Sequence, residues 1–193
     1  YTGTNWGQNL WCISLVIGLT ATPWRLGHGK ITEDGIFTDV CCDMTTMDAF
    51  NWFIQQGYLA PLVPRATRAL LDTDGVHMRG GEFIANELQS AVDKHHITEA
   101  ALKELLEYGS DRHSWLLFCA GVQHAQHVAD MLTDMGVPCK AVHSKMGDKE
   151  RDAAIAEWKA GRLRAIANNN VMTTGVDHPA LDLIGMLRPT ASP

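Results

Sequence analysis

The pattern of apolar and polar residues changes along the chain near Ser114. Beyond that residue, continuous apolar runs predict four buried strands, at 115–120, 139–144, 163–168 and 181–188. Between the first three runs, apolar residues recur every three or four positions, which predicts helices at 123–135 and from Asp148 to Gly161. Strands and helices that alternate at this spacing indicate an α/β fold, in which helices cover both faces of a parallel sheet.

The first part of the chain carries shorter signals. The apolar run Val16–Leu19 predicts a short buried strand, and Pro23 lies just beyond its end. Residues 48–57 predict a helix, because their apolar side chains share one face and Gly57 fits the position after a helix end. We therefore expect one strand and one helix in this part, with irregular backbone between them.

A connector separates the two parts. Asp-Gly and Gly-Gly steps within residues 65–81 predict a turn-rich segment, and two helices are expected after it, at 82–93 and 97–108. The second of these helices has one apolar stripe, made of Leu102, Leu105 and Leu106. The predicted organisation is a first domain at 1–64, a connector at 65–110 and a second domain at 111–193.

Composition and charge narrow the class of protein. The chain is 46% hydrophobic and 20% charged, with a net charge of −6. The longest apolar run, Leu10–Ala21, is shorter than the roughly 20 residues that a membrane-spanning helix needs. Five cysteines without a C-x-x-C pair indicate free thiols, a reducing compartment and a cytoplasmic protein. Residues 140–164 hold seven Lys and Arg against four Asp and Glu, so a local basic surface remains compatible with nucleic acid.

Polar residues after the third apolar run of the second domain offer a binding site. In open parallel sheets, ligands bind beyond the carboxyl ends of the strands. Thr173 and Thr174 provide hydroxyls and amides there, and Gly175 permits close approach of a ligand to the backbone. These groups suit a phosphate, while the carboxylate of Asp177 suits ribose hydroxyls or a cation. A plain turn, in which the same side chains cap local backbone groups, is the alternative.

Four segments of the sequence resemble motifs of superfamily 2 helicases, in the order found in that family. The run Thr20-Ala21-Thr22-Pro23 resembles motif III, and residues 115–132 (WLLFCAGVQHAQHVADML) resemble motif IV. Residues 171–190 (VMTTGVDHPALDLIGMLRPT) resemble motif V with the strand after it, and residues 142–166 resemble the segment between motifs IV and V. The resemblance covers Leu15 to Pro193 and is nearest to the RadD-like DNA repair helicases of the DEAD/DEAH type and their phage relatives.

The resemblance implies two RecA-like lobes, with ATP and Mg²⁺ in the cleft between them and a DNA or RNA strand running across both. It implies that Thr20 and Thr22 form a relay between the bound nucleotide and the second lobe. It also implies that Gly175 and Asp177 face the nucleotide. It also implies contacts to the nucleic-acid backbone from Gly121, Arg25, Lys145, Thr173 and Thr174. Such contacts read the backbone rather than the base sequence, and they weaken with salt.

The sequence departs from the family in three places. It contains no G-x-x-x-x-G-K-[ST] loop, no Mg²⁺-binding acid pair before Thr20 and no arginine-finger segment. By the resemblance, residues 1–64 correspond to the end of the first lobe and residues 111–193 to an incomplete second lobe. We expect the parent protein to be an ATP-driven helicase or translocase, and the 193 residues alone to be inactive toward ATP. A motor subunit of a restriction or remodelling system and a non-catalytic module that binds nucleic acid or protein stay open as alternatives.

Two other patterns suggest chemistry at first sight. Arg79–Phe83 (RGGEF) resembles the active-site signature of diguanylate cyclases, but the apolar periodicity after it favours a connector turn and the start of a helix. His124 and His127 share a helix face, but they lack Cys or carboxylate partners at ligand spacing, so no metal site is predicted.

Two packing predictions follow from the apolar pattern. Trp52, Trp115 and Trp158 stand at periodic apolar positions, so we expect all three in the core. The apolar run Leu10–Leu19 predicts an exposed edge of the first lobe that pairs with a second copy of the chain.

Overall fold

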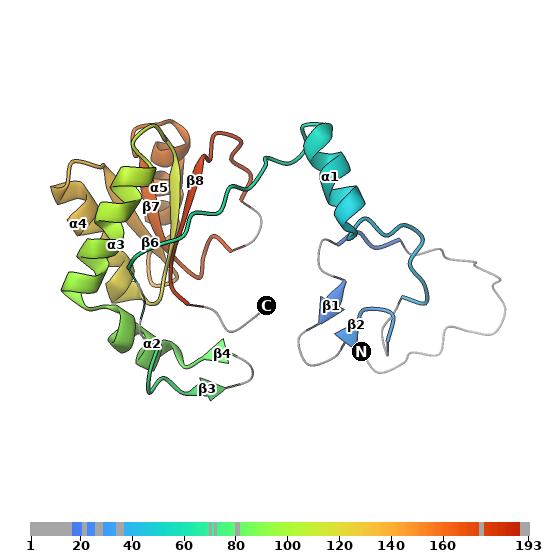
Figure 1. Cartoon of the computed structure of the whole chain (residues 1–193), viewed down its shortest axis with the longest axis horizontal. Helices are drawn as coiled ribbons and strands as arrows, with labels where there is room; N and C mark the ends of the chain where they lie inside the picture. Colours follow the sequence, from blue (N-terminus) through green and yellow to red (C-terminus); the bar gives the residue numbers. More distant parts are fainter. Residues whose placement is uncertain are drawn as a thin grey trace. The chain divides into compact units, whose positions relative to one another are not determined.

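The computed structural model describes residues 17–20, 23–25, 29–33, 37–69, 71, 73–79, 82–173 and 176–189. By its internal contacts the chain divides into two compact units, one ending at Pro64 and one beginning at Arg65 (Figure 1). None of the helices in these ranges is long and apolar enough to cross a membrane.

The second unit is built on a four-stranded parallel sheet. Its strands, in the order in which they pair, are β6 (Cys139–His143), β7 (Ala165–Asn169), β5 (Trp115–Cys119) and β8 (Leu183–Leu187). Two helices connect successive strands, α4 (Val122–Asp134) and α5 (Asp148–Lys159). These elements begin and end within one or two residues of the predicted positions, so the predicted α/β fold with a parallel sheet is confirmed.

Alternate residues of the two central strands, β5 and β7, face two separate cores, whereas Ile184 and Met186 of the edge strand β8 are 50% and 55% exposed. On one side, Trp115, Leu117 and Ala167 pack under α4 and α3 (His95–Tyr108). On the other side, Leu116 and Ile166 pack against α5 through its buried side chains, Ala154 and Trp158. Helices therefore cover both faces of the sheet, as the continuous apolar strands predict (Figure 1).

Two further helices precede the sheet. The stripe of Leu102, Leu105 and Leu106 on α3 packs on the sheet as predicted. The helix expected from residue 82 begins three residues later, as α2 (Ala85–Val92), because Glu82–Phe83 forms strand β4, which pairs with β3 (Met78–Arg79). Arg79, Glu82 and Phe83 of the RGGEF sequence therefore lie on the paired strands of a short hairpin, and Gly80 and Gly81 lie outside the described residues. Helix α2 packs against Ala120, just after β5, through Leu88 and Val92.

The first unit contains one helix and one short hairpin within its described residues. Helix α1 (Met47–Gln55) begins where Thr46 Oγ1 accepts a hydrogen bond from the Ala49 amide, at 3.2 Å, and Gly57 follows its end with φ +75°. Strands β1 (Trp24–Arg25) and β2 (Gly29–Lys30) pair in antiparallel fashion.

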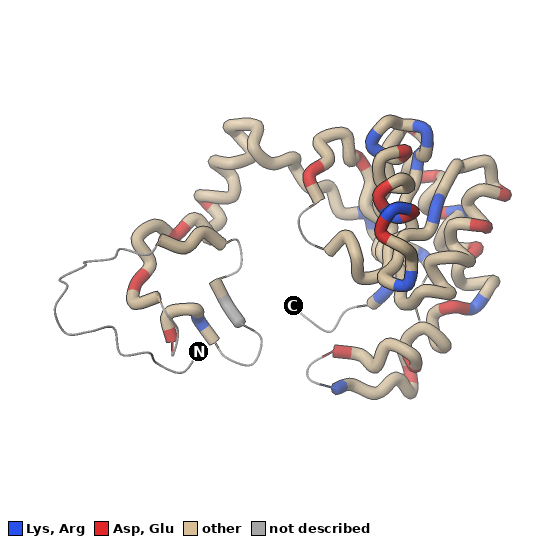
Figure 2. Tube along the Cα trace, turned by 180° about the vertical axis from the view of Figure 1, so that it is seen from behind, with Lys and Arg blue, Asp and Glu red and all other residues tan. Residues whose placement is uncertain are grey.

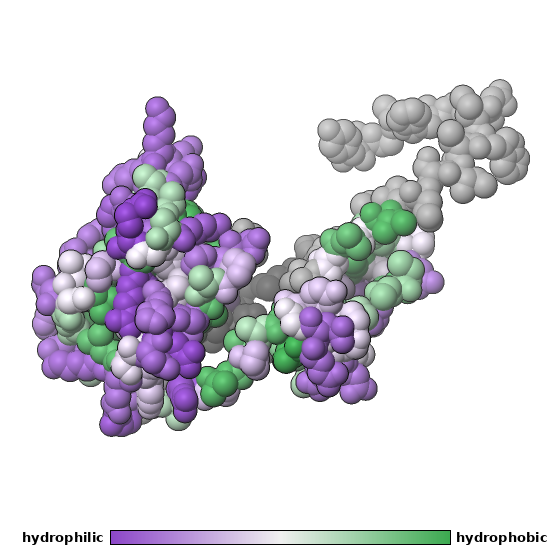
Figure 3. All heavy atoms as spheres, turned by 90° about the horizontal axis from the view of Figure 1, so that it is seen from above, coloured by the Kyte–Doolittle hydropathy of each residue, from purple (hydrophilic) through white to green (hydrophobic). Residues whose placement is uncertain are grey.

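Two packing predictions for the first unit are wrong. Residues 17–20 form no strand, and Ile17 and Leu19 are 68% and 97% exposed, whereas a buried strand was expected over Val16–Leu19. Trp52 is 45% exposed, and its ring contacts among the described residues are to Phe53 and Tyr58 of its own segment. Other apolar residues of this unit are exposed as well, and Figure 3 shows hydrophobic residues in green at its surface. An apolar side chain is buried only where other elements cover it, and the described part of this unit holds no sheet larger than two short strands.

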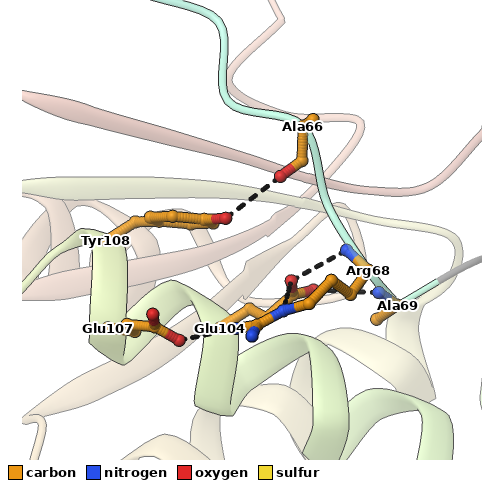
Figure 4. Close-up of polar contacts among 6 residues, drawn as sticks. All are labelled: Ala66, Arg68, Ala69, Glu104, Glu107 and Tyr108. Carbon is orange, nitrogen blue, oxygen red and sulfur yellow. Dashed lines mark hydrogen bonds and ion pairs between the residues drawn. The ribbon is translucent and has the colours of Figure 1, made fainter.

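The chain enters the second unit through a cluster of hydrogen bonds that we call the connector clamp. The carboxylate of Glu104, in the middle of α3, accepts from the backbone amides of Arg68 and Ala69, at 2.8 and 2.9 Å, and from Arg68 Nε at 2.9 Å (Figure 4). Arg68 Nη2 also pairs with Glu107 at 2.6 Å, and the Tyr108 hydroxyl donates to the carbonyl of Ala66 at 3.1 Å. Glu104 is only 7% exposed, so this contact places a buried charge under the connector.

Arg164 contacts the residues that follow the C-terminal end of α3. Its guanidinium donates to the carbonyls of Gly109 and Arg112, at 2.6 and 2.8 Å, and lies 4.6 Å above the ring of Trp115. The cation therefore satisfies carbonyls at the helix end and covers the largest side chain of the core at the same time.

Candidate functional site

The carboxyl ends of the four parallel strands lie at one edge of the sheet. The residues that follow these ends are Gly121 after β5, Lys145 after β6, Asn170 after β7 and Arg188 after β8. Lys145 is exposed, and Lys, Arg, Asp and Glu are interspersed over the rest of the second unit (Figure 2). Open parallel sheets bind ligands at this edge, so it is the candidate site.

Side chains tie neighbouring strand ends together at this edge. Asn169 Nδ2 donates to the carbonyl of Cys119, at 3.1 Å, which joins β7 to β5. Arg188 Nη1 donates to Asn170 Oδ1, at 2.6 Å, and Asn170 has the left-handed φ of +56° that asparagine tolerates. Because an amide is neutral, this bond does not compensate the charge of Arg188, which forms no ion pair with the residues that the structure describes. Arg188 was not predicted from the sequence, although its position directly after the fourth apolar run was the available signal.

The segment after β7 starts from a buried asparagine. Asn168 is fully buried, and its Oδ1 accepts from the amides of Val171 and Met172, at 3.1 and 2.9 Å. This turn leads to Thr173, whose side chain is exposed as a ligand-binding hydroxyl requires. Thr174 and Gly175, which were also predicted to bind, lie outside the described residues.

Gly121 is the residue before α4, and the side chain of Gln89 occupies the space that a larger residue at this position would need. A Cβ at this position would overlap the side-chain amide of Gln89, which reaches over from α2 and donates to Gln123 Oε1 at 3.1 Å. No side chain caps the first turn of α4. The predicted backbone contact from Gly121 to nucleic acid therefore lies beside Gln89, a residue that the sequence analysis did not single out.

The two histidines of α4 are already engaged in contacts within the protein. His124 is buried, and burial lowers its pKa, so the neutral ring accepts a hydrogen bond from the Ala120 amide at Nδ1, at 3.2 Å. His127 Nδ1 lies 3.0 Å from the carboxylate of Asp93, at the end of α2. Over the part of the chain that the structure describes, no group of three or more His, Cys, Asp or Glu could hold a metal ion.

Asp177 lies away from the carboxyl edge. The segment from β7 to β8 crosses the face that α5 covers, where Met172, Val176 and Leu181 contribute to the core. The carbonyl of Asp177 accepts from Lys159 Nζ, at 2.8 Å, at the end of α5, and the next residue pairs with Ser114, just before β5. Asp177 thus lies near the amino edge of the sheet, while Thr173 lies near the carboxyl edge, although the sequence suggested one common site.

The remaining predicted residues belong to the first unit. Thr20 is exposed on irregular backbone, and Arg25 pairs with Gly29 in the hairpin of β1 and β2. Thr22 lies outside the described residues, so the predicted relay through Thr20 and Thr22 stays a prediction.

Comparison with known proteins identifies the family. Residues 98–193 match the helicase conserved C-terminal domain. The protein irc3 of Schizosaccharomyces pombe, whose name assigns it to the mitochondrial ATP-dependent helicases, is 29% identical over 180 residues, which cover 88% of this chain and 27% of irc3. A 51.5 kDa protein of a Lactococcus phage is 24% identical over 176 residues, which cover 91% of this chain and 37% of that protein.

A third relative is the ATP-dependent RNA helicase DHH1 of Vanderwaltozyma polyspora, which is 22% identical over 190 residues, covering 86% of this chain and 39% of DHH1. The chain spans between 27% and 39% of the length of these three relatives. Residues 98–193 are a helicase C-terminal domain, which contains the parallel sheet, and the chain belongs to the superfamily 2 helicases.

Proposed function

We propose that this chain is part of an ATP-dependent helicase or translocase that acts on DNA, in DNA repair or phage DNA metabolism. The carboxyl edge of the second unit binds the phosphate backbone of one strand, through Lys145, Arg188 and Thr173 and through amides near Gly121. One observation carries this proposal: the matched helicase domain presents a guanidinium without a carboxylate partner among the described residues, a lysine and a hydroxyl at the edge where such sheets bind ligands. The resemblance to RadD-like helicases supports DNA as the substrate.

ATP binds between two lobes in this proposal, and the chain supplies a small part of that site. Asp177 is exposed, and its carboxylate suits the ribose hydroxyls. When bound, the nucleotide with its Mg²⁺ would supply the phosphoryl group that is transferred, and the rate of that transfer depends on positioning and charge neutralisation. The sequence contains no phosphate-cradling loop with its lysine, so the residues that hold the phosphates and Mg²⁺ are not among these 193.

We expect no ATP hydrolysis by the purified 193-residue chain, with or without DNA, because the phosphate-cradling lysine and the Mg²⁺-binding acids are missing from its sequence. Phosphate release measured with Mg²⁺, ATP and single-stranded DNA tests this expectation. A protein extended to include a complete first lobe serves as the positive control. DNA-stimulated turnover by the 193 residues alone would contradict the division of the nucleotide site.

The nucleic-acid site is tested by binding of a fluorescent single-stranded DNA 20-mer to the chain over a range of salt concentrations. We expect the Lys145→Ala and Arg188→Ala variants each to bind about threefold more weakly, and each to lower the salt dependence of log K by about 0.7, the value of one phosphate contact on a single strand. Lys103→Ala removes a lysine of α3 that pairs with Glu99, so it is the matched control and should leave binding unchanged.

Equal binding by all three variants would contradict the assignment of the carboxyl edge. An RNA 20-mer of the same sequence separates the substrates: tighter binding of RNA would favour an RNA helicase, which is what the name of DHH1 states for that relative. Strand displacement by the extended protein then distinguishes a helicase from the motor subunit of a restriction or remodelling system.

A further inference from the structure

The segment that carries Asp177 has no regular secondary structure to hold it. Residues 176–182 contain neither helix nor strand, although they lie between two strands of one parallel sheet. Parallel strands are usually joined by a helix, whose hydrogen bonds are internal and whose packing sets its place. Here the position of the backbone depends on contacts from neighbouring elements.

The end of α5 provides the first two contacts. Lys159 Nζ donates to the carbonyl of Asp177 at 2.8 Å, and the Lys159 side chain is otherwise exposed at the helix end. The ring of His178 lies on the buried ring of Trp158, with 4.3 Å between their centroids. Adjacent residues of one helix therefore hold adjacent residues of the segment, one through a charged hydrogen bond and one through ring packing.

The start of β5 provides the remaining contacts. Ser114 Oγ and His178 Nε2 form a hydrogen bond of 2.9 Å. The carboxylate of Asp182 accepts from the amides of His113 and Ser114, at 2.7 and 2.9 Å. Burial lowers the pKa of His178, and the charge of Lys159 lowers it further, against the opposing effect of Asp177 and Asp182, so the ring is neutral at pH 7.

We propose that Lys159, His178 and Ser114 are positioning residues that set where the Asp177 carboxylate projects toward the ribose of a bound nucleoside triphosphate. This inference rests on the proposed function, in which Asp177 faces that ribose. None of the three touches the nucleotide itself. They act by restraining the backbone on both sides of Asp177, so that its carboxylate is preorganised and less free energy of binding is lost in ordering it.

Lys159 gives the cleanest test, because its side chain is exposed and its removal leaves the cores intact. Lys159→Met removes the donor, and Lys159→Arg restores one. The matched control is Lys140→Met, since Lys140 also reaches α5, through an exposed pair with Glu157 at 2.8 Å, but does not contact the segment. Amide hydrogen exchange of residues 176–182 is measured on the intact 193-residue chain, and ATP hydrolysis is measured on a protein extended to include a complete first lobe.

We expect Lys159→Met to raise the exchange rates of residues 176–182 about fivefold, while Lys159→Arg and Lys140→Met match the wild type. In the extended protein we expect Lys159→Met to raise the KM for ATP about fivefold with kcat changed less than twofold, because binding and not the chemical step loses a contact. His178→Phe keeps an aromatic ring against Trp158 but loses the hydrogen bond to Ser114. It should raise the KM for ATP by a smaller factor than Lys159→Met does.

Unchanged exchange in Lys159→Met would overturn the inference. Faster exchange with an unchanged KM would also overturn it, because the restraint would then have no role in nucleotide binding, while the proposed function would stand. Absence of nucleic-acid-stimulated ATP hydrolysis in the wild-type extended protein would overturn the proposed function, and the nucleotide role of the three residues with it.

Discussion

Replacing Trp115 with alanine should lower the free energy of unfolding by about 3–5 kcal/mol. Trp115 is fully buried at the centre of the core under α3 and α4. Its indole nitrogen donates to the carbonyl of Arg112, and its ring supports the guanidinium of Arg164. The variant therefore creates a large cavity and leaves a cation without its aromatic partner. Urea unfolding followed by circular dichroism at 222 nm measures the loss, which is a large share of the roughly 5–15 kcal/mol typical of a domain.

Trp52→Ala is the matched control for this prediction. Trp52 is 45% exposed and stacks only on residues of its own segment in the first unit. We expect its removal to change the main unfolding transition by less than about 1 kcal/mol. Equal destabilisation by the two tryptophan variants would show that the two sites are buried alike, contrary to the structure.

Replacing Glu104 with glutamine should raise the population of the open connector, in which the hydrogen bonds of the clamp are broken, about tenfold. Glutamine keeps the shape of the side chain but removes the charge. Its amide group keeps one oxygen as an acceptor and replaces the other by an NH2 group that can only donate, so either the amide of Arg68 or the amide of Ala69 loses its acceptor. A hydrogen bond to a charged group contributes about 1.5 kcal/mol or more, so its loss shifts a local opening equilibrium by about a factor of ten. Trypsin cleavage after Arg65 and Arg68 reports this opening, because cleavage requires a locally unfolded chain (Figure 4).

Glu107→Gln is the control for the clamp, since Glu107 is largely exposed and pairs with the same arginine through a single bond. We expect it to change cleavage less than twofold. If both variants were cleaved at the same rate, Glu104 would not be the residue that holds the connector.

The pH dependence of the clamp has a defined sign. Donation from the amide of Ala69, and then from the amide and side chain of Arg68, lowers the pKa of Glu104 below its ordinary value. A carboxylate with a lowered pKa contributes stability that is present above the ordinary glutamate pKa of about 4.3 and is lost as the pH falls through the folded value. The difference in urea midpoint between the wild type and Glu104→Gln should therefore narrow below about pH 4.3. A difference that stays constant down to acid unfolding would contradict this account.

The candidate site was predicted in part. Thr173 is exposed after the third strand, where the polar residues that end a buried apolar run indicate the end of a strand, and its binding role stays a prediction. Arg188 was missed, since its distance from Asn170 along the chain hides a contact that the sheet order creates. The anchoring of Asp177 by Lys159 was missed for the same reason.

By itself, the sequence determined the four strands of the parallel sheet and the two helices between them. Short continuous apolar runs are typical of strands in a covered parallel sheet, and glycines with positive φ, such as Gly136 and Gly161, end the helices between them. The tertiary structure alone decided which elements meet. Periodicity tells which side of an element is apolar but not what lies against it, so it could not separate Trp115 from Trp52. Nor could it show that Glu104 is buried, because a charge on a helix is buried only when partners from distant residues satisfy its oxygens.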